Sequence, residues 1–259
     1  RTLTIIVVSG NREGHVMLGG AAVLVLVAVG MLAVAVVLVG RGRLGGDTAT
    51  LRVVRGGAVV YGVIVLILTV LAVGSQLLLD TVEVALPTET FWPVLPEGVE
   101  MTPGGDARIV GGGFTETLSS VSGLGMGARA LLAAGTLVQG LTQLAVTAAV
   151  FLIAHRLLAG EPFRPVVRKA VLLAAAALIG GGILWQVCTG IGEFMAANEV
   201  LGAVGWSWDE SLGIDDPTVL MPEPRLGITI QFWPIFTGFA LAAVAAAFRY
   251  GEALERDTV

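Results

Sequence analysis

Charged residues are scarce in this chain, and their scarcity argues against a water-soluble domain. Of 259 residues, 14% are charged and 55% are hydrophobic, whereas soluble domains carry about 25% charged residues. One water-soluble core cannot bury that much apolar surface, so we expect lipid to solvate much of it. The net charge of −5 says little as a sum, because the two signs are segregated along the chain.

Cysteine and histidine are nearly absent, which argues against several kinds of chemistry. Cys188 is the single cysteine, so no intrachain disulfide can form, and its apolar surroundings indicate a packing residue. His15 and His155 are far apart in sequence, and no spacing typical of a metal site occurs. There is no Ser/His/Asp set, phosphate loop or basic nucleic-acid surface. We therefore predict a non-enzymatic protein without catalytic residues, cofactor, metal or nucleic-acid partner.

Five apolar stretches are long enough to cross a bilayer, which takes ~20 helical residues. They are approximately residues 16–40, 56–79, 128–154, 170–192 and 228–248. No charged residue lies deep inside them, which counts against ion-coupled transport. The predicted fold class is an all-α polytopic membrane protein with five transmembrane helices. The first stretch is too long for a cleaved signal peptide and lacks its basic start; we favour a true helix over a signal anchor or a segment foreign to the core.

The basic residues predict the orientation of the spans. Ten of the fifteen follow the first, third and fifth stretches: Arg41, Arg43, Arg52 and Arg55; Arg156, Arg164, Arg168 and Lys169; Arg249 and Arg256. By the positive-inside rule these segments are cytoplasmic. The C-terminus is then cytoplasmic and the N-terminus extracytoplasmic. Because arginine far outnumbers lysine and Ala, Val and Gly abound, we infer a GC-rich bacterial genome and a multi-pass protein of the bacterial cytoplasmic membrane.

The two remaining connections, residues 80–127 and 193–227, are long and acidic. Several parts alternate at period two, which is typical of strands: Thr81–Val84, Ala107–Val110, Phe114–Leu118 and Gly227–Ile230. Proline and glycine separate these parts, with Pro87 as the first such breaker. We predict that the two connections pair into a small β-containing extracytoplasmic cap. It is either a binding cap or a packed lid over the helix ends.

Two motifs resemble a known family. They are Gly160-Glu161-Pro162-Phe163, followed by Val167-Arg168-Lys169, and the tail FRYGEALERDTV at residues 248–259. Over about residues 50–259 the chain resembles the uncharacterised DUF2975 family of bacterial membrane proteins. The resemblance implies four transmembrane helices with two extracytoplasmic segments, and it supplies no catalytic residues. Residues 1–49 are then an N-terminal segment with an extra helix, and residues 50–259 a four-helix membrane domain.

A polar face on the third stretch is the first candidate binding site. Thr136, Gln139, Gln143 and Thr147 share one helical face, and the predicted partners on neighbouring helices are Ser75, Gln76, Gln186 and Thr189. Membrane-embedded glutamines usually hydrogen-bond between helices. The candidate ligand-binding residues are Gln76, Gln139, Gln143 and Gln186; the alternative is that they only join helices.

Two charged segments are candidates for contact with a partner or with lipid. Arg164, Arg168 and Lys169 lie beside Pro162 and Pro165, which fix a turn, and their charges suit anionic headgroups. The alternative is that they only set topology. Asp209 and Glu210 belong to the acidic cap. Glu193 could bind a cation or a basic partner, or be a solvated helix end.

Three functions compete on this evidence. The first is a non-enzymatic accessory subunit or sensor that binds a membrane or envelope protein through the acidic cap. The second is a small transporter, or a protein that binds lipid or another hydrophobic ligand, through the polar face of the third stretch. The third is an intramembrane enzyme, which we disfavour because Glu193, His155 and Cys188 do not converge by spacing.

Overall fold

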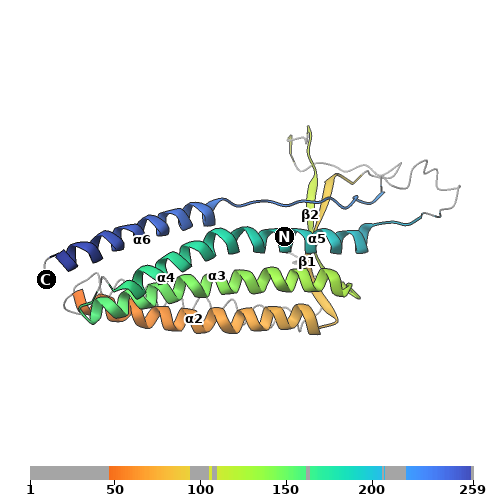
Figure 1. The fold of residues 1–259 in the computed structure, drawn as a ribbon. Coiled ribbons are helices and arrows are strands. Elements are labelled where there is room, and N and C mark those ends of the chain that lie inside the picture. The colour runs from red at the N-terminus through yellow and green to blue at the C-terminus, as the bar shows by residue number, and fades with distance from the viewer. Residues whose placement is uncertain are drawn as a thin grey trace. The chain divides into compact units, whose positions relative to one another are not determined.

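The computed structural model describes residues 47–93, 105–106, 110–161, 164–205, 207 and 220–257. Its elements, in chain order, are α2 (Asp47–Leu78), β1 (Thr81–Phe91), β2 (Phe114–Ser122), α3 (Met126–Leu158), α4 (Pro165–Ala176), the π-helical segment η1 (Ala177–Gly181), α5 (Gly182–Leu201) and α6 (Trp233–Asp257) (Figure 1). The predicted first span, residues 16–40, lies outside the described residues. The described part is mostly helical, with one small sheet.

Four helices of the described chain are long and apolar enough to cross a membrane. They comprise Thr48–Leu78, Met126–Leu158, Pro165–Leu201 and Trp233–Tyr250, and each overlaps one of the last four predicted stretches. Several predicted helix boundaries were wrong. The first described helix begins at Asp47 rather than 56, and the last ends at Asp257 rather than 248. The third helix continues to Leu201 rather than ending near residue 192, and the fourth begins at Trp233 rather than 228. Glu193 and Glu199 therefore lie within α5, whereas the sequence predicted Glu193 at the end of this helix and Glu199 in the connection beyond it.

A π-helical segment interrupts the third candidate span between α4 and α5. It comprises Ala177–Gly181, and short π segments inside α-helices often mark functional or strained positions. The Thr142 hydroxyl of α3 donates to Val138 O at 2.8 Å and lies 3.5 Å from Ala177 O. A Cβ on Gly181 would overlap that hydroxyl. The glycine therefore lets the π segment approach Thr142 closely.

The sheet consists of β1 and β2, which pair antiparallel from Thr81 with Ser122 to Pro87 with Glu116. The strands predicted at 81–84 and 114–118 are confirmed, whereas residues 107–109 of another predicted strand lie outside the described residues. Pro87 was predicted to end its strand and instead lies inside β1. Its missing N–H is tolerated because the register shifts just beyond it, between Pro87 and Phe91.

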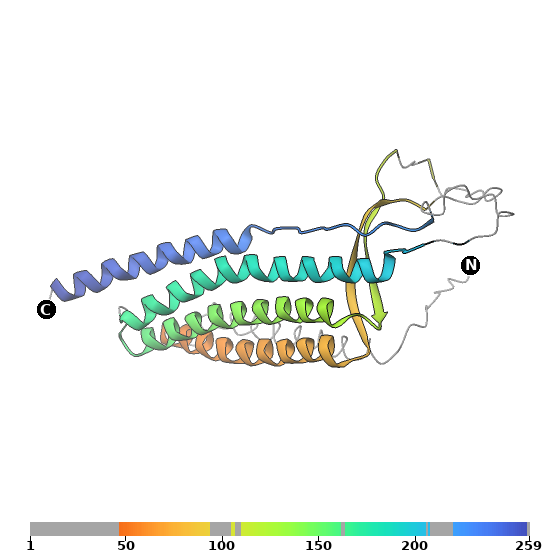
Figure 2. The same cartoon turned by 45° about the vertical axis from the view of Figure 1, so that its right-hand side comes forward.

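The second acidic connection contributes less β structure than predicted. Residues 227–230 form no strand, and the described parts of the two connections share one β-bridge, Thr88 with Pro224. The segment instead runs beside α5 (Figure 2), where Gly190 meets Ile228 and Gln186 binds the backbone of Gln231. The backbone N–H and C=O of Gln231 hydrogen-bond to the Gln186 side chain, so they do not require pairing with another strand.

The chain divides into two compact units, each with its own apolar cluster. Unit 1 contains the described parts of residues 47–68, 143–175 and 240–257, and unit 2 those of residues 69–142 and 176–239. In unit 1, α4 packs against α6 through Val167, Val171 and Ala245. In unit 2, β1 packs against α3 and α5 through Val82, Val84, Leu86, Leu124, Ala128, Leu132, Ala196 and Ala197.

Candidate functional site

Within the sheet of unit 2, β1 has one buried face, whereas every residue of β2 is exposed or half-buried. Val82, Val84 and Leu86 alternate along β1 and are each at most 4% exposed, because they pack on α3 and α5. Burial of each such side chain stabilises the unit by roughly 1.5–3 kcal/mol. The alternate residues face away from the helices. The exposed face is therefore presented by a sheet anchored through its other side.

Large apolar side chains lie on this exposed face. Phe114 and Leu118 of β2 are 55% and 76% exposed, and Leu118 is paired with Ala85 of β1. Trp92 stacks on Phe114 with ring centroids 5.3 Å apart, which extends the apolar surface beyond the strand ends. Exposed apolar surface on an ordered element is a feature of interaction sites.

Carboxylates lie among these apolar residues. Glu83 and Glu89 of β1 and Glu116 of β2 are all exposed. The strands themselves contain no lysine or arginine. Arg225 lies beside β1, where its N–H donates to Pro87 O at 3.0 Å. The exposed face of the sheet is therefore apolar and acidic. We call Glu83, Phe114, Glu116 and Leu118 the sheet surface.

Arg129 holds the helix ends beneath the sheet, and we did not single it out from the sequence. Its side chain is 7% exposed and donates to Leu79 O at 2.5 Å, Asp80 O at 2.8 Å and Leu124 O at 2.9 Å. The last carbonyls of a helix have no partner within it and attract cations. Arg129 therefore ties the end of α2, where β1 begins, to the start of α3. The available signal was an arginine at the edge of an otherwise acidic connection.

Glu199 has a comparable role at the start of α3. Its carboxylate accepts a hydrogen bond from the N–H of Gly125 at 2.7 Å, and a Cβ on Gly125 would come 2.6 Å from the same carboxylate. Negative charge at a helix N-terminus is stabilising. The end of α5 is thus joined to the start of α3.

The four candidate glutamines do not converge on one site. Gln76 hydrogen-bonds with Thr136 at 3.1 Å, one of the interhelical contacts that the sequence predicted. Gln186 is 6% exposed; its Oε1 accepts from Gln231 N and its Nε2 lies 3.3 Å from Gln231 O. Gln139 and Gln143 are half-buried and make no side-chain hydrogen bond to the described residues. Gln139 belongs to unit 2 and Gln143 to unit 1.

Replacing Gln186 by leucine is expected to loosen the segment before α6. The change leaves the part-buried N–H of Gln231 without its acceptor, and loss of such a hydrogen bond costs about 0.5–1.5 kcal/mol. We expect faster hydrogen exchange across residues 226–232, measured by mass spectrometry. Gln139→Leu is the matched control and should change stability by less than about 0.5 kcal/mol. Equal exchange in the two variants would contradict the role given to Gln186.

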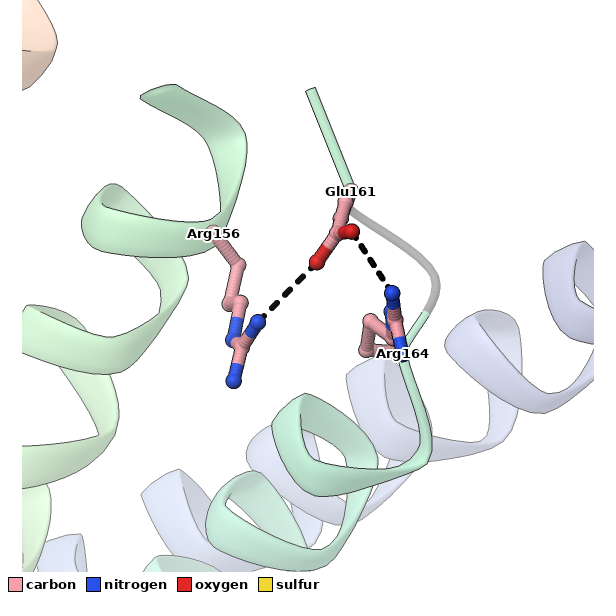
Figure 3. A network of polar contacts seen from close by, with 3 residues as sticks. All are labelled: Arg156, Glu161 and Arg164. Carbon is pink, nitrogen blue, oxygen red and sulfur yellow. Dashed lines mark hydrogen bonds and ion pairs between the residues drawn. The ribbon is translucent and has the colours of Figure 1, made fainter. Parts of the chain in front are cut away.

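A second cluster of charges lies in unit 1, in the turn between α3 and α4. Glu161 accepts from Arg164 Nη2 at 2.6 Å and from Arg156 Nη1 at 3.0 Å, as Figure 3 shows. The hydrogen bond from Arg164 is the main cause that lowers the pKa of the Glu161 carboxyl below its ordinary 4.5. Nearby, Arg55 of α2 lies 3.5 Å from His155 of α3. The carboxylate thus joins the two ends of the turn.

Of the four remaining candidate residues, the structure describes two. Lys169 is exposed on α4 and Arg168 is half-buried, whereas Asp209 and Glu210 lie outside the described residues. Within the described part of the chain, no group of three or more His, Cys, Asp or Glu residues could hold a metal ion.

Replacing Glu161 by glutamine is expected to lower the melting temperature by about a few degrees at pH 7, because exposed ion pairs contribute little. A carboxyl with a lowered folded-state pKa stabilises the fold at higher pH, and this contribution is lost as the pH falls through the folded-state value. The difference between wild type and variant should therefore shrink below pH 4.5. Thermal melts from pH 3 to pH 7 test this, with exposed Glu223→Gln as control; a difference that does not change with pH would contradict it.

No family model, curated protein or solved structure matches this chain. The resemblance to the DUF2975 family therefore stays a prediction that rests on the motifs at residues 160–169 and 248–259.

Proposed function

We propose that this chain is a non-enzymatic integral membrane protein that binds a protein partner through the sheet surface, as an accessory subunit or sensor. The observation that carries the proposal is the exposure of Phe114 and Leu118 on either side of Glu116, on a sheet whose strand β1 packs against the helices. A lid that only covered helix ends would need apolar residues on the face that contacts the helices and none on the other face. The exposed face therefore requires a separate explanation, and a partner supplies it.

The magnitudes indicate what the partner must provide. Covering Phe114 and Leu118 contributes roughly 1.5–3 kcal/mol each, so together roughly 3–6 kcal/mol. Association costs roughly 4–15 kcal/mol in lost freedom. Apolar contact alone does not give a stable complex, so polar groups of the sheet must contribute as well. The carboxylates favour a partner whose binding surface is basic.

The charges of the described connections support an orientation for this protein. The turn between α3 and α4 and the adjoining helix ends contain Arg156, Arg164, Arg168 and Lys169 against one carboxylate, Glu161. By the positive-inside rule the turn is cytoplasmic. A span carries the chain across the bilayer, so the sheet, which precedes α3, is extracytoplasmic. Its partner is then another membrane protein or an envelope protein.

Site-specific photocross-linking in native membranes tests the proposal. A photoreactive amino acid at Leu118 is expected to capture one protein reproducibly. The same group at Leu184, a 51% exposed residue of α5, is the control and should capture lipid. Reversal of charge by Glu83→Lys and Glu116→Lys should reduce capture at Leu118 at least fivefold. Lipid or random products at both positions would refute the proposal.

The alternative function, transport or binding of a lipid or other hydrophobic ligand, receives less support. Gln76 and Gln186 are engaged within unit 2, which leaves Gln139 and Gln143 of the four candidates. The test of this alternative is mass spectrometry of co-purifying lipids. Unchanged ligand content in the Gln139→Leu/Gln143→Leu variant would exclude it.

A further inference from the structure

We propose that the outer edge of β2 accepts an extended, basic segment of the partner as a third strand. This inference rests on the proposed function and deepens it, because it names how the partner binds and what chemistry its binding segment has. Strand addition supplies main-chain hydrogen bonds for affinity and side-chain pairing for specificity. Contact through the exposed apolar residues alone does not give a stable complex, and main-chain hydrogen bonds supply the additional polar stabilisation.

The edge of β2 is available within the described part of the chain. The sheet has two strands, β1 next to β2, and no other described residue pairs with β2. All nine residues of β2 are exposed or half-buried. Its sequence FTETLSSVS contains no proline or lysine and a single charge, Glu116, whereas natural edge strands are usually protected by such residues or by bulges. β2 has the features of an edge that accepts another strand.

The opposite edge of the sheet is already in use. At β1 the N–H of Glu89 donates to Glu223 O at 2.9 Å, and the N–H of Arg225 donates to Pro87 O at 3.0 Å. Pro222 and Pro224 lack N–H groups and limit this contact to one bridge. An incoming strand therefore meets a partly occupied edge at β1 and an open one at β2.

The charges identify the segment as basic. Glu83, Glu89 and Glu116 are exposed on the two strands, which contain no lysine or arginine. Directly opposed like charges destabilise a strand pair, and opposite charges stabilise it. A second copy of this chain would bring its own carboxylates to the edge, so the charges oppose pairing of β2 with itself. A basic segment of another protein is the occupant that they favour.

The spacing on β2 gives the pattern of the segment. Phe114, Glu116 and Leu118 lie on one face at period two. A matching strand places an apolar side chain beside Phe114, a basic one beside Glu116 and an apolar one beside Leu118. The predicted recognition pattern is therefore apolar, any residue, basic, any residue, apolar.

The test uses the full-length protein in lipid nanodiscs and the fluorescent peptide VTKTVTKTV. We expect salt-sensitive binding by fluorescence anisotropy, with slower hydrogen exchange across residues 114–122. The control is the same peptide with every backbone amide methylated, which keeps the side chains and charge but removes the N–H donors. Binding of the methylated peptide is expected to be at least tenfold weaker. Glu116→Lys should weaken binding of the parent peptide about fivefold.

The outcomes separate this inference from the proposed function. Equal binding of both peptides would overturn strand addition, while leaving the acidic sheet as a partner surface. Absence of binding by either peptide would also overturn it, and the partner surface would still stand if Leu118 captured a protein in native membranes. Slow exchange of residues 114–122 without peptide, together with dimers in solution, would instead identify a second copy as the occupant and refute the inference.

Discussion

Replacement of Arg129 by methionine is expected to destabilise the protein by about 3–5 kcal/mol, because three main-chain carbonyls lose a charged donor and each such hydrogen bond contributes about 1.5–3 kcal/mol. Methionine roughly preserves the length and apolar contacts of the side chain. It removes the donors to Leu79 O, Asp80 O and Leu124 O and leaves these carbonyls without a partner. For a chain of this size the melting temperature should fall by roughly 10 °C.

Two further variants isolate the cause of this loss. Arg129→Lys keeps the charge but presents one compact ammonium group in place of a planar fork, so we expect it to recover only part of the stability. Arg225→Met removes an exposed arginine of the same unit and should change stability by less than about 0.5 kcal/mol. Thermal melting in nanodiscs measures all three. Similar melting temperatures for Arg129→Met and Arg225→Met would show that the carbonyl contacts contribute little.

The position of Arg129 connects stability to the proposed function. Asp80 directly precedes β1, and Leu124 lies two residues after the end of β2, so one side chain fixes both ends of the hairpin. Loss of its hydrogen bonds should therefore mobilise the sheet before the helices separate. We expect hydrogen exchange across residues 81–91 to increase first in Arg129→Met, and photocapture through Leu118 to fall with it.

The sequence predicted those parts of the fold that local patterns determine. Apolar runs located four described helices, and period-two alternation located the strands around Val82 and Phe114. The failures came where a distant contact decides the outcome. Pro87 lies inside β1 because the register of the hydrogen bonds between β1 and β2 shifts just beyond it. Ile228 lies outside any strand because its segment packs against α5. Neither the register shift nor the packing on α5 can be predicted from the local sequence.

The candidate site was predicted in part for the same reason. The acidic character of the connections was readable from composition, and it led to a partner-binding cap. The exposure of Leu118 was not readable, because alternation gives two faces without saying which one packs on helices. Arg129 was overlooked because its partners are main-chain carbonyls, which have no signature in the sequence.

Replacement of Gly135 by leucine is expected to destabilise unit 2 by about 3 kcal/mol, the upper end of the range of about 1–3 kcal/mol that is typical when extra atoms are forced into a packed contact. A Cβ at Gly135 would overlap the Thr189 hydroxyl and lie 3.2 Å from both Thr189 N and Trp185 O. Two of these three atoms belong to the backbone of α5, which cannot rotate away. Small residues allow such close approach between membrane helices.

Gly74→Leu is the matched control, because a Cβ at Gly74 meets no atom within 4 Å. Glycine inside a helix costs roughly 0.5–1 kcal/mol relative to alanine, so this variant should be neutral or slightly more stable. The two substitutions are chemically identical, in helices of the same unit, and are expected to shift the melting temperature in opposite directions. Equal shifts would contradict the close approach of α3 and α5.

A double variant separates crowding by the side chain from crowding by the backbone. Thr189→Ala in the Gly135→Ala background removes the overlapping hydroxyl but leaves Thr189 N and Trp185 O at 3.2 Å from the new Cβ. We expect only partial recovery of the melting temperature. Full recovery would mean that the hydroxyl alone requires glycine at this position. Partial recovery would mean that the backbones of α3 and α5 meet at Gly135, so the residue sets the distance between the two helices on which β1 packs.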